Sequence, residues 1–190
     1  MAFWGTDLGA EGANFGDPKR KFRFKVEIGE LGFVWWAKSC DKPKYDITTA
    51  EHQFLHHKFY FPGKVEWQEV SMTLVDPDGN EDQVRALTKI VEDAGYKVPG
   101  SPNSQLTSFS KNSMVDSIGF VKIKQIDADG TTIEEWTLKN PILTKADFGS
   151  LEYGDDGLVE VQIAFRYDWA TCLIDGEATP VLYDSSNPAS

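Results

Sequence analysis

All three histidines of this chain lie in one short stretch, at positions His52, His56 and His57. Clustered imidazoles suggest a metal site, and zinc needs three or four ligands that converge on one point. If this stretch is a strand, His52 and His56 share one face at a separation of roughly 13 Å, and His57 points to the other face. One ion cannot bridge that gap. We therefore expect no metal here and interpret the imidazoles as residues of a half-exposed, contacting strand.

Two groups of acids could also carry chemistry. Asp155 and Asp156 precede Gly157, but sugar hydrolysis needs two carboxylates held at a fixed separation, and adjacent turn residues point apart. Asp127 and Asp129 flank a glycine-containing turn and lack the further oxygen ligands of a calcium loop. We interpret both groups as turn residues.

Other catalytic signatures are missing from the sequence. Cys40 and Cys172 lie far apart and form no C-x-x-C pair, so we expect two buried thiols in a reducing compartment. The sequence contains no G-x-S-x-G elbow and no phosphate-binding loop. It has no apolar run long enough for a transmembrane helix, and we expect no secretory signal because the start of the sequence shows no basic, then apolar, then small-residue pattern. We predict a protein without catalytic residues or cofactors, and not an enzyme.

The net charge of −11 is unevenly distributed along the chain. Residues 1–70 carry equal numbers of basic and acidic side chains, so residues 71–190 contain the whole acidic excess. Such a surface disfavours tight phosphate binding and would repel nucleic acid or recruit basic partners. Ordinary solubility explains the same charge.

The elements that must position these residues are mostly strands. Alternation of apolar and polar residues predicts a strand at 21–28 and a long one at 159–169. Further strands are expected at 33–38, 46–50, 54–61, 65–75 with a bulge near Gln68 and Glu69, 118–126, 131–138 and 142–148. Pro62 and Gly63 are expected to form a turn, and Trp35 and Trp36 to place one aromatic ring on each sheet face.

One amphipathic helix is predicted between Asn80 and Gly95. Asn80 is the expected N-cap with Gln83 as its capping-box partner, and Gly95 is the expected stop. The inward stripe is Val84, Leu87, Ile90, Val91 and Ala94. Residues 97–113 are expected to form an irregular loop. The pattern favours a mainly β fold, a β-sandwich or half-barrel with one flanking α-helix, over residues 19–174. We expect an arm at 1–18 and an exposed tail at 175–190.

Several stretches, in a fixed order, are similar to one family. They are 17–24 (DPKRKFRF), 35–38 (WWAK), 59–70 (FYFPGKVEWQEV), 73–77 (TLVDP), 125–130 (QIDADG) and 166–171 (RYDWAT). Over residues 17–174 they resemble the tail tube proteins of T-even-like contractile-tailed bacteriophages, particularly the cyanophage type.

The resemblance implies a structural subunit of a phage tail tube. Six subunits would close into a ring whose strands form one many-stranded barrel, and rings would stack around a channel. The implied partners are further copies of the chain, the tail sheath, tape-measure, baseplate and tail terminator proteins, and viral DNA passing through without specific binding. The protein would be assembled in the host cytoplasm and located in the virion tail, with no membrane insertion of its own.

The resemblance also implies roles for particular residues. The excursion at 44–63 would contact neighbouring subunits and rings, with His52, Phe54, His56, His57, Phe59 and Tyr60 as candidates. Carboxylates lining the channel would repel DNA phosphates. Candidates for this wall are Asp129, Glu134 and Glu135.

Two alternatives remain open. A baseplate tube initiator or tail terminator would use the same fold. A monomeric carbohydrate- or protein-binding β-sandwich would be a protein of a different class, in which Trp35 and Trp36 would form a stacking platform for the ligand.

Overall fold

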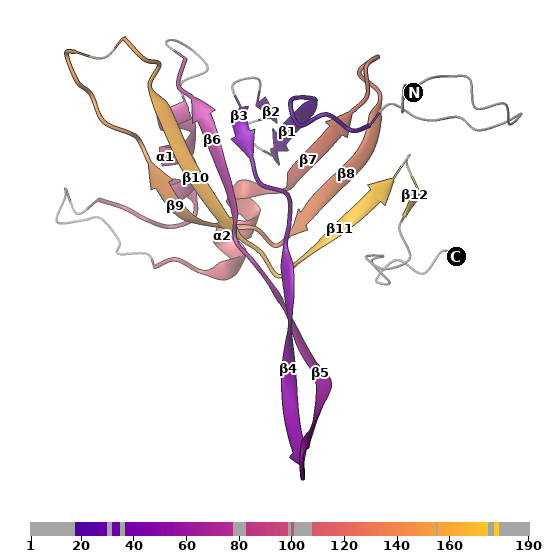
Figure 1. Cartoon of the computed structure of the whole chain (residues 1–190). Helices are drawn as coiled ribbons and strands as arrows, with labels where there is room; N and C mark the ends of the chain where they lie inside the picture. The colour runs from indigo at the N-terminus through magenta and orange to yellow at the C-terminus, as the bar shows by residue number, and fades with distance from the viewer. Residues whose placement is uncertain are drawn as a thin grey trace, which may run out of the picture.

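The computed structural model describes residues 18–29, 32–34, 37–77, 83–98, 100, 108–154, 156–174 and 177–178. Within these residues the chain is mainly β, as predicted, with three antiparallel sheets and two helices (Figure 1). Residues 1–17 of the expected arm at 1–18, most of the expected tail at 175–190 and the Trp35–Trp36 pair lie outside the described residues. Neither helix is long and apolar enough to cross a membrane.

Two of the sheets form the body, and the third is a hairpin. The six-stranded sheet has the order β12 (Glu177–Ala178), β11 (Trp169–Ile174), β8 (Thr132–Lys139), β7 (Val121–Ile126), β1 (Phe24–Ile28) and β2 (Gly32–Val34). The four-stranded sheet has the order β3 (Ala37–Cys40), β6 (Val70–Val75), β10 (Glu160–Arg166) and β9 (Ile142–Asp147). The hairpin pairs β4 (Tyr45–Phe54) with β5 (His57–Trp67). Figure 1 shows the two larger sheets diverging as a V, with the hairpin projecting from the region where they meet.

The core lies between the two larger sheets. Alternate residues of each strand point inward, so that Val26 of β1, Ile123 of β7 and Phe165 of β10 are buried. On β6, Val70, Met72 and Leu74 form the inward face and are buried. Phe22, which precedes β1, is exposed.

Helix α1 (Gln83–Asp93) confirms the predicted helix. It buries Leu87 and Ile90 in the core, and Gly95 follows it with a φ of 114°. The expected N-cap Asn80 lies outside the described residues. The backbone N–H of Gln83 donates to Asp76 Oδ1 at 3.0 Å, so the end of β6 also holds the start of the helix.

A second helix, α2 (Lys111–Ile118), was not predicted. The sequence suggested a loop to residue 113 and a strand from 118, because the KNSMVDSI stretch has little apolar periodicity. Its signal is the N-cap: Ser110 Oγ accepts from the Ser113 N–H at 3.1 Å, and Gly119 ends the helix. Strand β7 starts only at Val121.

The predicted long strand at 159–169 is two strands in different sheets. It breaks at Tyr167 and Asp168, so that β10 belongs to the four-stranded sheet and β11 to the six-stranded sheet. The alternation continues through this corner, which is why the pattern did not reveal it. Similarly, the predicted strand at 33–38 is divided between β2 and β3.

Candidate assembly surface

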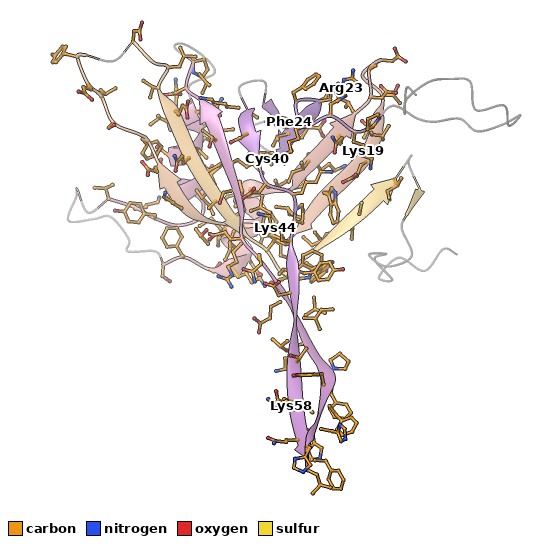
Figure 2. All side chains as sticks on the ribbon, in the orientation of Figure 1. Lys19, Arg23, Phe24, Cys40, Lys44 and Lys58 are labelled. Atoms are coloured by element: carbon orange, nitrogen blue, oxygen red, sulfur yellow. The ribbon has the colours of Figure 1, made fainter. Side chains whose placement is uncertain are left out.

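The β4–β5 hairpin stands apart from the body. Its strands pair only with each other among the described residues, and nearly every residue in them is exposed. A lone two-stranded hairpin is at best marginally stable in water. Figure 2 places Lys44 at its base and Lys58 near its tip.

The hairpin turns at a different place from the one predicted. Phe54 pairs with His57, so the turn is Leu55–His56, with Leu55 at a φ of 54°. The predicted turn at Pro62 and Gly63 is wrong, because both residues lie inside β5. The register shifts there, between the pairs Ile47 with Val65 and Thr49 with Pro62, which is a bulge.

The turn changes the arrangement of the histidines. His52 lies opposite Phe59 and His57 opposite Phe54, so the two imidazoles share one face. The expectation that His57 faces away from His52 is therefore wrong, and His56 lies in the turn rather than on the strand. No group of three His, Cys, Asp or Glu side chains among the described residues could hold a metal ion.

The same face carries the tip patch, which we define as Phe54, Phe59 and Phe61. Their exposed fractions are 61%, 50% and 56%. The other face of the tip is more polar: Glu51 pairs with Lys58 at 2.9 Å and lies opposite Tyr60. All six candidate contact residues are exposed on this hairpin, and their role in contacts remains a prediction.

The base of the hairpin is fixed to the body. The Tyr45 and Trp67 ring centroids lie 5.2 Å apart, and those of Trp67 and Tyr167 lie 5.8 Å apart. The Gln68 N–H donates to the Lys44 carbonyl at 2.8 Å. Burial raises the pKa of the Tyr167 phenol to about 12, so it stays neutral. The hairpin is therefore a projection with a defined origin.

The three candidate channel acids do not share one face. Glu134 is only 8% exposed and points toward the body, where it contacts Lys19, Lys42 Nζ at 2.6 Å and the Trp136 indole N–H. Burial would raise the pKa of Glu134, but the hydrogen bonds from these three partners outweigh it and lower the pKa to about 2.

Glu135 lies on the opposite face of β8, in a ladder of ion pairs. Its carboxylate is 3.0 Å from Lys122 and 3.4 Å from Lys124, which in turn contacts Glu27 of β1 at 2.8 Å. Burial opposes ionisation, yet the two lysines lower the pKa of Glu135. Asp129 is exposed in the β7–β8 turn. A channel role for the three acids stays a prediction.

The two thiols are free. Cys172 is buried, as predicted, but Cys40 is only half-buried, so the prediction of two buried thiols is correct for one of them. Burial raises the pKa of Cys40 to about 12, with a further contribution from the Asp41 carboxylate, so the thiol stays protonated at neutral pH.

Sequence reasoning missed one exposed surface entirely. The connection between β9 and β10 carries Phe148, Leu151, Tyr153 and Leu158, all exposed. The available signal was the presence of large apolar side chains in a stretch rich in Gly, Ser and Asp. An apolar surface of this kind commonly marks an interaction site.

Comparison with known proteins supports the fold. No protein-family profile and no curated protein sequence matches the chain. A solved chain of the anti-feeding prophage cap, the tube terminating cap, is 17% identical with a TM-score of 0.64, over 88% of this chain and 99% of that one. A chain of the PVC sheath/tube terminator of an extracellular contractile injection system is 15% identical with a TM-score of 0.61, over 84% and 99%.

A chain of the PVC sheath-tube complex in its extended state is also similar. It is 16% identical with a TM-score of 0.58, over 84% of this chain and 94% of that chain. At these identities the likeness concerns the fold. The predicted mainly β fold is thus confirmed, and these chains share it.

Proposed function

We propose that this chain is a structural subunit of the inner tube of a contractile tail or injection particle. The observation that carries the proposal is the free-standing β4–β5 hairpin with its tip patch of three exposed phenylalanines. A long, aromatic, two-stranded projection needs a partner surface to be stable. The fold shared with chains of contractile injection structures makes further copies of this chain the natural partner.

In the proposed assembly, copies close into rings by joining their sheets. The described sheets end in the edge strands β12 and β2, and β3 and β9. Unpaired edges favour association with another chain, and closing them into one barrel removes the edges. A barrel of many strands encloses an aqueous channel. The sequence resemblance favours six copies per ring, with hairpins contacting the neighbouring ring.

The finer partners follow from the same proposal. The tube would be surrounded by a sheath and bounded by a baseplate and a terminator. It would hold a tape-measure protein before viral DNA passes through it. The particle would be a phage virion of the T-even-like type, and the subunit would have no catalytic role. Asp129, Glu134 and Glu135 remain the candidates for acids on the channel wall.

Electron microscopy of the purified chain tests the proposal. Negative-stain images at rising concentration should show rings and then stacked tubes, with a tube initiator added if needed. Replacing Phe54 and Phe59 with Ser should abolish stacking and leave the circular dichroism spectrum of the body unchanged. Phe120→Ser removes an exposed phenylalanine from elsewhere and serves as the matched control. Monomers at every concentration, with an initiator present, would refute the proposal.

A tube terminator is the second candidate. Two of the similar structures are described as a tube terminating cap and a sheath/tube terminator. The two functions differ in their effect on growing tubes: a tube subunit lengthens them in proportion to its amount, whereas a terminator limits their length. Tube lengths measured at increasing protein concentration distinguish the two.

A further inference from the structure

The connection between β9 and β10 exposes several large apolar side chains. We define the apolar arm as residues 148–154 and 156–159. Leu151 is 87% exposed, Leu158 is 75% exposed and Tyr153 is fully exposed. The arm contains Glu152 and Asp156 and no basic residue, so it is acidic as well as apolar. Figure 1 shows it as the orange loop that extends from the four-stranded sheet.

A groove of about 910 Å³ lies between β1 and β3, next to the segment that precedes β1. We call it the lysine groove. Its apolar lining includes Phe22, Phe24 and Ile123, of which Phe22 is exposed. Figure 2 labels Lys19, Phe24 and Cys40 around it. The groove therefore offers apolar surface that a leucine or tyrosine side chain could cover.

Five lysines and one aspartate line the lysine groove. Lys19 and Lys42 share a single carboxylate, that of Glu134. Lys38 pairs with Glu160 at the surface. Lys124 pairs with Glu27 at 2.8 Å and with Glu135 at 3.4 Å, so the five lysines are balanced by five carboxylates. The side chains of Lys19, Lys38 and Lys42 are nevertheless 45%, 60% and 44% exposed, which leaves their ammonium groups accessible to further carboxylates. By contrast, the groove of about 590 Å³ along α1 is lined by one lysine and one glutamate.

The arm and the groove lie at opposite edges of the four-stranded sheet. The strand order is β3-β6-β10-β9, so the arm connects the two strands at one edge, and β3 forms the other edge beside the groove. A second copy that set its own β9 edge beside this β3 edge would bring its arm toward the groove. A contact between two different surfaces of identical chains is heterologous, and its repetition closes a ring when the rotation allows.

We propose that the apolar arm of one copy docks in the lysine groove of the next copy of the same ring. Leu151, Tyr153 and Leu158 would cover the exposed rings of the groove, and Glu152 and Asp156 would meet its lysines. Complementary charge fixes the register of such a contact and speeds association. The inference rests on the proposed function in that it assigns one lateral contact within the ring.

Charge reversal on each side is the test, with full-length chain and ring formation measured by mass photometry. Glu152→Lys with Asp156→Lys should raise the concentration for half-assembly at least about tenfold, because like charges that face each other at an interface strongly disfavour association. Lys21→Glu with Lys38→Glu should do the same. The pair that Lys38 makes with Glu160 is exposed, so its loss should leave folding intact. Combining all four changes in one chain should restore assembly.

Matched controls carry the same charge changes on or beside α1. Glu92→Lys with Asp93→Lys matches the arm variant, and Lys89→Glu with Lys97→Glu matches the groove variant. Both controls should assemble at the concentration of the wild type. If they fail as the arm and groove variants do, or if the combined variant is not restored, the effect is one of net charge and the proposed contact is wrong.

A cross-linking measurement keeps the test independent of those variants. Tyr153→Cys with Phe22→Cys should give a ladder of disulfide-linked copies on a non-reducing gel after ring formation. If the wild type forms rings and no ladder appears, this inference fails alone. If the wild type forms no ring under any condition, the proposed function fails as well.

Discussion

The carboxylate of Glu134 couples two distant segments to the six-stranded sheet, and its removal should destabilise the fold in a pH-dependent way. It contacts Lys19, from before β1, and Lys42, from after β3, and accepts from the Trp136 indole. Glu134→Gln keeps the shape of the side chain and an oxygen acceptor but removes the negative charge. The two ammonium groups would then lose their shared counter-ion in a partly buried site.

The pKa of Glu134 gives the size of the effect. Its pKa is lowered from 4.5 to about 2 in the folded protein. Lowering a pKa by one corresponds to about 1.4 kcal/mol, so the charged form contributes about 3 kcal/mol to the free energy of unfolding. Because the pKa is lower in the folded state, this contribution is fully present above pH 4.5. It is lost as the pH falls toward 2.

Urea unfolding of the wild type and Glu134→Gln at several pH values between 7 and 2 measures this difference. We expect a gap of about 3 kcal/mol at pH 7 that closes at the acid end. Asp129→Asn, which removes a carboxylate from an exposed turn, is the control and should show little change at any pH. A gap of constant size from pH 7 to pH 2 would show that the charge of Glu134 is not its cause.

Three further predictions concern the hairpin, the core and α2. Gly63→Ala should impair tube formation, because a Cβ there would lie 2.4 Å from Thr48 Oγ1 and distort the hairpin. The melting temperature should not fall, because the hairpin stands apart from the core. A variant that assembles normally would contradict this prediction. Phe165→Ala should cost about 3–5 kcal/mol in urea unfolding, since the ring is fully buried between the sheets, and a loss below about 1 kcal/mol would argue against the described core. Ser110→Ala should cost about 1 kcal/mol through loss of the α2 N-cap, and Ser110→Asp should not, because aspartate also caps helices.

Much of the core could be predicted from the sequence, because alternation reports directly on burial. Val161, Ile163 and Phe165 are all buried and alternate with Glu160, Gln162, Ala164 and Arg166, of which only the small Ala164 is apolar and also buried. The same pattern cannot show where a strand leaves one sheet for another. Tyr167 is still an inward residue at the corner, so the alternation continues while the hydrogen-bonded partners change from β9 and β6 to β8.

The hairpin was harder to predict, because its two turn signals compete. Pro62 and Gly63 form the stronger local turn signal, but the chain turns at Leu55 and His56. The position of the turn follows from the pairing of the ten residues of β4 with the eleven residues of β5. That pairing involves the whole length of both strands and cannot be read from a few neighbouring residues. The apolar arm was missed for a related reason. Alternation and helical periodicity reveal apolar residues that face the core of their own chain, and they give no signal for apolar residues that are exposed in a loop. Leu151 faces no such core.

The aromatic stack at the base of the hairpin has a mechanical consequence. The ten residues of β4 span about 30 Å, and the stack ends on Tyr167, at the corner where the chain passes between the two large sheets. A sideways force on the tip of the hairpin would therefore be transmitted through the aromatic stack to this corner. Such a force would alter the angle between the two large sheets, so that a load on the tip of the hairpin would displace both sheets together.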